Sequence, residues 1–233
     1  MRLNILLIAL PALIAAPVSY HVLPTWFGEG SRYWIVDFFV GVAIPLLCLY
    51  TLYKKGVGPN DYGLPRSLGG YKIAEFVSIS FLCTLAFLAS IIVDTIARIY
   101  CVIDPVGDPG LRLGRDGFGM LTVVYYATTA AFFDEIFFRG VLGAVFLKNR
   151  TQVNTIVYAC VSASLFTIAH SGSDLASTIS YLYFGIVSAM VYVLLRNLWP
   201  LIIAHFITDV VLLTWWLHVF NTGLNGLNGP GSN

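Results

Sequence analysis

Seven long apolar runs, spread over nearly the whole chain, limit what this sequence can fold into. They cover residues 3–23, 33–53, 74–97, 119–147, 152–170, 175–195 and 198–220. Each run is close to the roughly 20 residues that an α-helix needs to cross about 30 Å of hydrocarbon. Only 11% of the residues are charged, against roughly a quarter in a soluble domain. The sequence therefore predicts an all-α, polytopic integral membrane protein with about seven transmembrane helices.

The positively charged residues between the runs predict how the helices are oriented. If the N-terminus lies inside, the inner segments hold eight of these residues and the outer segments hold four. The inner residues are Arg2, Lys54, Lys55, Arg66, Lys72, Lys148, Arg150 and Arg196, and the outer residues are Arg32, Arg98, Arg112 and Arg115. This excess predicts an N-in, C-out arrangement. The first run has no clear small-x-small cleavage site, so we expect a retained helix rather than a signal peptide.

Three ionisable residues lie inside the fourth run, although a charge at mid-bilayer costs about 2.5–3.5 kcal/mol on insertion scales. They are Asp134, Glu135 and Arg139 of the stretch FFDEIFFRG. Glu135 and Arg139 are four residues apart, so they share a helix face and can pair. Asp134 is rotated about 100° away around the helix. Taken alone, the stretch fits two interpretations equally well, an ion-pair clasp between helices and an active site.

Two later runs add further polar side chains to the interior. His170 ends the fifth run, and His205 and Asp209 are four residues apart in the seventh. A carboxylate can act as a general base on water while histidines donate to a developing oxyanion, which is the chemistry of peptide hydrolysis. Alternatively, His170, His205, Asp209 and Glu135 include the ligands for a Zn²⁺ ion with an open position for water. A proton relay in a transporter is a third interpretation.

Several other classes of membrane protein are excluded by missing motifs. The sequence has no HExxH zinc-protease motif, no GxSG serine motif and no GxGD aspartyl motif. The last lysine is Lys148, which excludes a retinal Schiff base in the seventh run. The sequence also has no paired broken helices of the kind found in inverted-repeat transporters. A net charge of +1 gives no argument for a nucleic-acid partner.

The three motifs together resemble the CPBP family of intramembrane proteases, also called Abi or CAAX-protease-like. That family includes the endopeptidase that trims prenylated CAAX proteins, and its pattern is EExxxR, FxxxH and HxxxN or HxxxD on three helices. The matches, in the family's order, are Asp134-Glu135-x-x-x-Arg139, Phe166-x-x-x-His170 and His205-x-x-x-Asp209. The resemblance covers about residues 117–215 and implies an active site inside the helix bundle.

The resemblance also implies a role for each matched residue. Asp134 takes the place of the water-activating base, and Glu135 with Arg139 forms the organising pair. The two histidines and the last polar residue of the pattern shape the oxyanion or water site. One departure concerns Asp134, because the family usually has Glu there and Asp is one methylene shorter. Misplacing a catalytic group by about 1 Å can cost roughly a hundredfold in rate, so either the backbone compensates, Glu135 becomes the base, or the protein is weak or inactive.

A second departure concerns Asp209, since an ionised Asp cannot donate to an oxyanion as Asn can. Asp209 would more naturally orient His205 or bind a metal. The depths of the histidines raise a geometric difficulty as well. At about 1.5 Å per residue, His205 lies about 14 Å deep counted from Arg196, and His170 lies about 28 Å deep counted from Thr151. A shared site therefore predicts strong tilt in the fifth or seventh helix, or a fifth helix that starts outside the hydrocarbon.

We divide the chain into N-terminal membrane helices and loops over residues 1–116, a CPBP-like catalytic core over 117–220 and a disordered tail over 221–233. The leading hypothesis is an intramembrane endopeptidase, either glutamate-type or a metalloprotease with Zn²⁺. Its partners are the lipid bilayer and a membrane-tethered peptide or protein, with prenylated C-termini among the candidates. The alternatives are a catalytically silent membrane scaffold and, less favoured, a proton-coupled transporter. We expect a prokaryotic plasma membrane.

Overall fold

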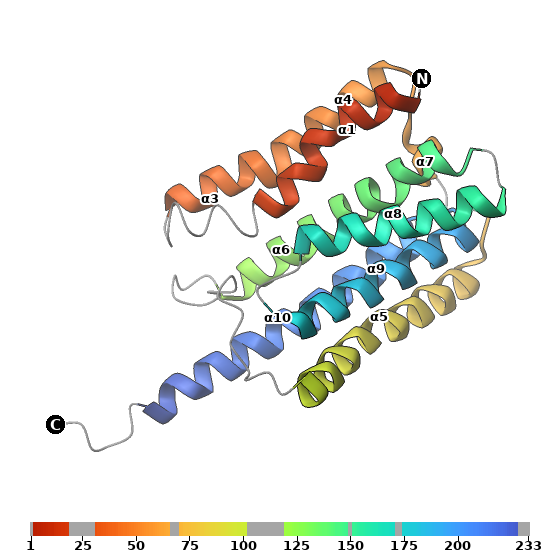
Figure 1. Cartoon of the computed structure of the whole chain (residues 1–233). Coiled ribbons are helices and arrows are strands. Elements are labelled where there is room, and N and C mark those ends of the chain that lie inside the picture. Colours follow the sequence, from red (N-terminus) through yellow and green to blue (C-terminus); the bar gives the residue numbers. More distant parts are fainter. Residues whose placement is uncertain are drawn as a thin grey trace.

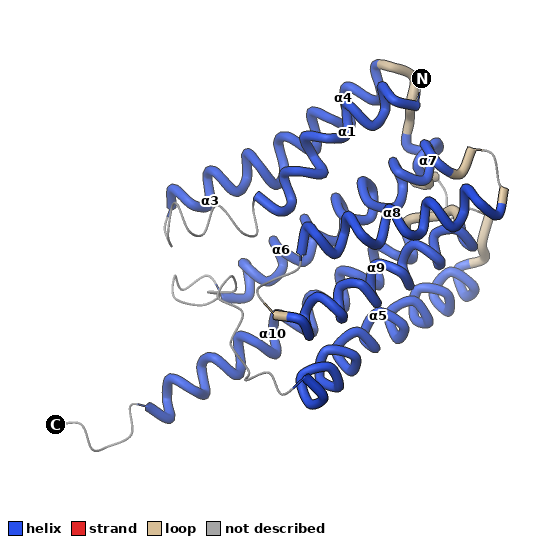
Figure 2. The backbone as a smooth tube through the Cα atoms, viewed as in Figure 1, coloured by secondary structure: helices blue, strands red, loops and turns tan. Residues whose placement is uncertain are grey.

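A computed structural model of the chain describes residues 2–18, 31–65, 70–101, 119–148, 151–170 and 174–227. These residues are almost entirely helical and contain no strand (Figures 1 and 2). The helices are α1 (Arg2–Pro17), α3 (Ser31–Phe38), η2 (Phe39–Ala43), α4 (Ile44–Lys54), η3 (Pro59–Tyr62), α5 (Ile73–Cys101), α6 (Gly119–Asp134), η4 (Glu135–Val141), α7 (Leu142–Phe146), α8 (Gln152–His170), α9 (Leu175–Leu195) and α10 (Trp199–Leu227). The prediction of an all-α polytopic membrane protein is confirmed.

The helices join into rods that follow the seven predicted runs. The π-helical turn η2 connects α3 to α4 without a break, and η4 connects α6 to α7 in the same way. Four described helices are long and apolar enough to cross a membrane, at 35–54, 73–100, 152–170 and 175–195. Two further apolar helices, at 3–15 and 199–215, are shorter. The orientation of the rods relative to the membrane remains a prediction.

The rods pack in two groups (Figure 1). Helix α1 lies along α4 and reaches the rod that carries the charged motif at η4 and α7. The larger group is a bundle in which α8 packs on α9, α6 packs on α10, and α5 packs on both α9 and α10. Although α5 belongs to the predicted N-terminal segment, it is therefore part of the bundle that contains the predicted core.

The inner loop 54–72 folds back against the bundle over its described residues. Val57 and Tyr62 are buried, and the Leu198 N–H donates to the Gly63 carbonyl at 2.7 Å. Gly63 has a φ of +85°, a left-handed conformation that favours glycine. A Cβ atom added at Gly140 would lie only 2.4 Å from the Tyr62 carbonyl oxygen. The loop is thus in direct backbone contact with the rod that carries the charged motif.

Two sequence-based expectations differ from the structure. Helix α10 continues to Leu227, seven residues into the segment predicted as a disordered tail, because extending an existing helix costs far less than starting one. Residues 228–233 lie outside the described part. The four cysteines are scattered singly through the sequence with no CxxC spacing, which predicts small buried side chains. Cys48 and Cys83 are buried, but Cys160 is exposed on α8. The outer face of a membrane helix is as apolar as its inner face, so an apolar neighbourhood does not predict burial.

Candidate active site

Glu135 and Arg139 of the charged motif lie on a π-helical turn, and Asp134 is the last residue of α6 just before it. η4 spans Glu135–Val141, and all seven of its residues are buried. π-Turns widen the helix and occur frequently at functional sites. Two α8 hydroxyls bond to this turn: Ser162 donates to the Phe138 carbonyl at 2.6 Å, and Tyr158 donates to the Arg139 carbonyl at 3.2 Å. These bonds satisfy buried carbonyls in the widened turn and so stabilise its shape.

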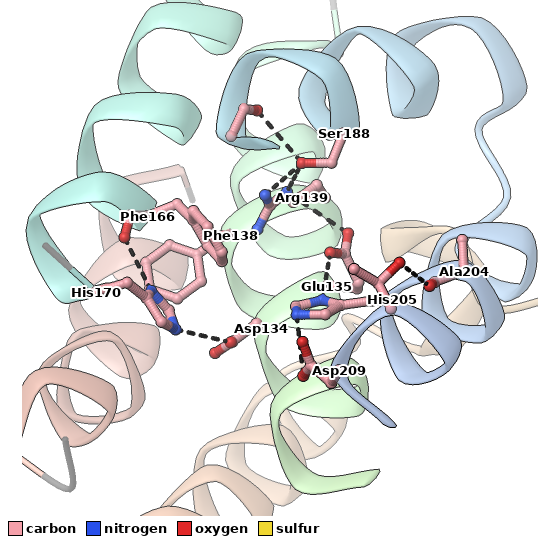
Figure 3. Close-up of polar contacts among 12 residues, drawn as sticks. Asp134, Glu135, Phe138, Arg139, Phe166, His170, Ser188, Ala204, His205 and Asp209 are labelled. Atoms are coloured by element: carbon pink, nitrogen blue, oxygen red, sulfur yellow. Dashed lines mark hydrogen bonds and ion pairs between the residues drawn. The ribbon is translucent and has the colours of Figure 1, made fainter. Parts of the chain in front are cut away.

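Glu135 and Arg139 are in contact, as their spacing predicted. The Arg139 Nε atom lies 3.5 Å from Glu135 Oε2, and both side chains are fully buried. The shorter bonds of the guanidinium go elsewhere, because Nε donates to Ser188 Oγ at 2.7 Å and Nη2 donates to the same oxygen (Figure 3). The guanidinium carbon also lies 4.2 Å from the ring centre of Phe166, which gives a cation–π contact. The clasp therefore extends from η4 to both α8 and α9.

His205 of α10 lies between two carboxylates. Its Nδ1 atom is hydrogen-bonded to Glu135 Oε1 at 2.9 Å, and its Nε2 atom lies 3.5 Å from Asp209 Oδ2. The second distance is too long for a good hydrogen bond. A carboxylate oxygen such as Glu135 Oε1 can only accept, so Nδ1 carries the proton of this hydrogen bond. An Nε2–H in this position is not committed to Asp209 and can donate to another acceptor.

His170 pairs with the other acid of the motif. Its Nε2 atom lies 3.2 Å from Asp134 Oδ2, and both side chains are largely buried. Its Nδ1 atom lies 2.9 Å from the Phe166 carbonyl oxygen, which can only accept, so Nδ1 carries a proton. The fixed tautomer leaves Nε2 to share a proton with Asp134. Figure 3 shows Asp134 directed toward His170 and Glu135 directed toward His205.

The two histidines converge on one aromatic ring despite the depths counted along upright helices. The centre of the Phe166 ring is 4.2 Å from that of His170 and 6.3 Å from that of His205. The two histidines contact different carboxylates, because His170 pairs with Asp134 and His205 pairs with Glu135. All six predicted site residues are thus brought into one connected cluster.

Several polar atoms in this cluster make no hydrogen bond within the described part of the chain. They are Asp134 Oδ2, Glu135 Oε2 and Arg139 Nη1, all of them buried. The first two take part only in the ion-pair contacts given above. Buried polar atoms of this kind usually bind ordered water or a ligand. The cluster therefore offers two acceptors and one donor to a small polar molecule.

The four predicted zinc ligands, His170, His205, Asp209 and Glu135, all lie within the cluster. Among the described residues, no group of three or more His, Cys, Asp or Glu side chains is placed to hold a metal ion. His170 and His205 point at different carboxylates, and their facing nitrogens are engaged in separate pairs. Zn²⁺ held by His170, His205 and Asp209 or Glu135 therefore stays a prediction.

Sequence reasoning missed three residues that support the cluster, namely Tyr158, Ser162 and Ser188. Tyr158 and Ser162 lie in apolar helix α8, and nothing in their local sequence marks them. Ser188 has a weak signal, because it follows Gly185 by three residues in an otherwise apolar helix. Small residues at such spacing favour close helix packing, and a Cβ atom at Gly185 would lie 3.0 Å from Ala163 Cα of α8.

Part of the chain is similar to a known protein family. A family model described as Rce1-like, Type II CAAX prenyl endopeptidase, matches residues 116–211. The matched segment contains all three motifs and every residue of the cluster described above. No curated protein and no solved structure is significantly similar to the chain.

Proposed function

Residues 116–211 belong to the CAAX protease family, and from this premise we propose that the cluster hydrolyses a peptide bond without a metal. The substrate is a membrane-tethered peptide or protein, and prenylated C-termini are the first candidates. The observation that carries the proposal is the pairing of Asp134 with His170, whose tautomer is fixed by the Phe166 carbonyl. A carboxylate beside an oriented imidazole is suited to remove a proton from water.

In the proposed reaction, a water held at the Asp134–His170 pair loses one proton to Asp134 as its oxygen bonds to the scissile carbonyl carbon. The carbonyl oxygen becomes an oxyanion, which accepts a hydrogen bond from Nε2 of His205. Glu135 holds the imidazole of His205 through a hydrogen bond at Nδ1, and Asp209 lies too far from Nε2 for a good hydrogen bond. The C–N bond then breaks, and the proton on Asp134 passes to the leaving nitrogen, with His170 assisting. The products are a carboxylic acid and an amine, and transfer of the acid's proton to the amine leaves a carboxylate and an ammonium ion.

The roles of the two adjacent acids differ in this proposal. Glu135 is fully buried and lies between His205 and Arg139, so it is poorly placed to serve as the base. Asp134 contacts His170 despite its shorter side chain. We therefore assign the base to Asp134 and the organising function to Glu135.

The test is cleavage of prenylated and unprenylated membrane-tethered peptides by purified protein in detergent, with products identified by mass spectrometry. We expect cleavage by the wild type and loss of at least a hundredfold in Asp134→Asn and His205→Ala, in line with the loss of a general base or an oxyanion donor. Asp61→Asn, in the exposed inner loop, is the matched control and should cleave at the wild-type rate. Full activity in Asp134→Asn would contradict the assignment of the base.

A catalytically silent membrane scaffold is the second candidate, favoured by the substitution of Asp for the family's usual Glu at position 134. The variant Asp134→Glu separates the two candidates. Cleavage by Asp134→Glu together with no cleavage by the wild type would support the silent protein. Cleavage by the wild type that is insensitive to metal chelators would support the proposed metal-free hydrolysis, whereas loss with a chelator and recovery with Zn²⁺ would contradict it.

A further inference from the structure

Ser188 connects helix α9 to the cluster, although none of the three motifs lies on that helix. Its side chain is fully buried. Ser188 Oγ accepts hydrogen bonds from Nε and Nη2 of Arg139 and lies 3.3 Å from the Gly185 carbonyl oxygen, to which it donates. One hydroxyl thus serves as acceptor for two N–H groups of a buried cation (Figure 3).

We propose that Ser188 is a positioning residue of the active site, which restrains Arg139 so that Glu135 stays aligned with His205. This inference rests on the proposed hydrolysis for its catalytic consequence. Its structural part, the alignment of His205 by way of Ser188, does not depend on which peptide is cut.

Ser188 and Glu135 compete for the Arg139 guanidinium. A carboxylate is a stronger acceptor than a hydroxyl, and Arg–carboxylate pairs frequently adopt two parallel hydrogen bonds. Here the order is reversed, since Arg139 Nε is 2.7 Å from Ser188 Oγ and 3.5 Å from Glu135 Oε2. The guanidinium also lies over the Phe166 ring. Ser188 and Phe166 together hold the cation away from a close pair with the carboxylate.

This restraint leaves the Glu135 carboxylate available to α10. Oε1 of Glu135 accepts from Nδ1 of His205 at 2.9 Å, while Oε2 has no hydrogen-bond partner among the described residues. If the guanidinium turned toward Glu135, two parallel bonds would engage both carboxylate oxygens. Glu135 Oε1 would then be shared between Arg139 and His205, and His205 would lose part of the support for its donor. The sequence of contacts runs from Ser188 through Arg139 and Glu135 to His205.

The experiment compares Ser188→Ala with Ser188→Thr, which retains the hydroxyl. Ser80→Ala is the matched control, because Ser80 is also buried but bonds only to the Phe76 carbonyl of its own helix. Three quantities are measured in detergent: kcat and KM for peptide cleavage, the melting temperature, and the side-chain NMR resonances of ¹⁵N-labelled histidine. The His205 signal is identified by its loss in His205→Ala.

We expect Ser188→Ala to lower kcat by about tenfold to a hundredfold, the range for loss of a hydrogen bond to a charged group. KM should change by less than about twofold, because Ser188 does not touch substrate. The Nδ1–H resonance of His205 should move upfield as its bond to Glu135 weakens. Ser188→Thr should restore both the rate and the resonance, and Ser80→Ala should leave both at wild-type values.

A purely structural role for Ser188 predicts a different pattern. A lower melting temperature in Ser188→Ala, with the His205 resonance and kcat of the folded protein unchanged, would overturn the proposal. If Ser188→Ala does not fold, Ser188→Cys keeps a side chain of similar size with a weaker acceptor. It should shift the His205 resonance in the same direction by a smaller amount, and no shift would overturn the proposal as well.

The two proposals can fail separately. The NMR measurement needs no substrate. A shift of the His205 resonance in Ser188→Ala therefore supports the positioning role even if the wild type cleaves no peptide. Absence of cleavage by the wild type would count against the proposed function alone. Conversely, the wild type could cleave peptides while the His205 resonance in Ser188→Ala stayed unchanged. That result would support the proposed protease function and contradict the positioning role of Ser188.

Discussion

Replacing Arg139 by methionine tests the energetics of the buried cluster. Methionine fills a similar length with an apolar, flexible chain, so the main loss is the charge and its hydrogen bonds. Arg139 is fully buried and contacts Glu135, Ser188 and Phe166. The variant leaves the Glu135 carboxylate fully buried, with the His205 imidazole as its hydrogen-bond partner.

Removing one member of a buried ion pair costs about 3–5 kcal/mol, because the remaining charge has no compensation. We expect the lower end, about 3 kcal/mol, because His205 bonds to Glu135 at 2.9 Å and partly replaces the lost cation. A loss of 1 kcal/mol lowers the melting temperature of a chain of this size by about 2–4 °C. Arg139→Met should therefore melt about 6–12 °C below the wild type.

The double variant Arg139→Met/Glu135→Gln removes both charges and should recover at least half of this loss. Arg98→Met is the control, since Arg98 pairs with Asp94 at a partly exposed site, where ion pairs contribute about 0–1 kcal/mol. Melting is followed by tryptophan fluorescence of the purified protein in detergent at neutral pH. The reasoning would be refuted if Arg139→Met melted within about 2 °C of the wild type, or if the double variant were less stable than the single one.

Two further changes test the contacts that shape the site. Gly140→Ala places a Cβ atom 2.4 Å from the Tyr62 carbonyl oxygen, so it should destabilise the protein by about 1–3 kcal/mol, whereas Gly58→Ala, with its nearest atom at 3.8 Å, should melt nearer to the wild type. Equal melting of the two variants would contradict the close approach. Asp174→Ala removes the N-cap of α9, whose carboxylate accepts from the Ser177 N–H at 2.7 Å, and should cost about 0.5–2 kcal/mol. Burial tends to raise the pKa of Asp174, but the hydrogen bonds from Ser177 outweigh it and leave the pKa below its usual value. The carboxylate contribution is thus complete above the unfolded pKa and is lost only as pH falls through the folded one. The penalty of Asp174→Ala should be equal at pH 7 and pH 5, and a smaller penalty at pH 5 would contradict the lowered pKa.

Much of the fold could be predicted because it depends on short-range features. Runs of about 20 apolar residues specify membrane helices whatever their neighbours are, and the rods α5, α8 and α9 follow the predicted runs closely. The three motifs could be recognised because each spans only five or six consecutive residues. The contact of Glu135 with Arg139 likewise followed from their separation of four residues.

The sequence could not determine what each polar group faces across the bundle. Both faces of a membrane helix are apolar, so the pattern of side chains does not reveal which face is buried, as Cys160 illustrates. The widened turn at Glu135 depends on contacts with α8 that no local pattern encodes.

The sequence by itself determined that this is a helical membrane protein with six polar residues on three helices in a protease-like order. Only the tertiary structure decided how these residues pair, with Asp134 beside His170 and Glu135 beside His205. It also brought Ser188 to Arg139 from 49 residues away. The physical reason is that covalent spacing fixes neighbours along one helix, whereas contacts between helices arise from the packing of the whole bundle.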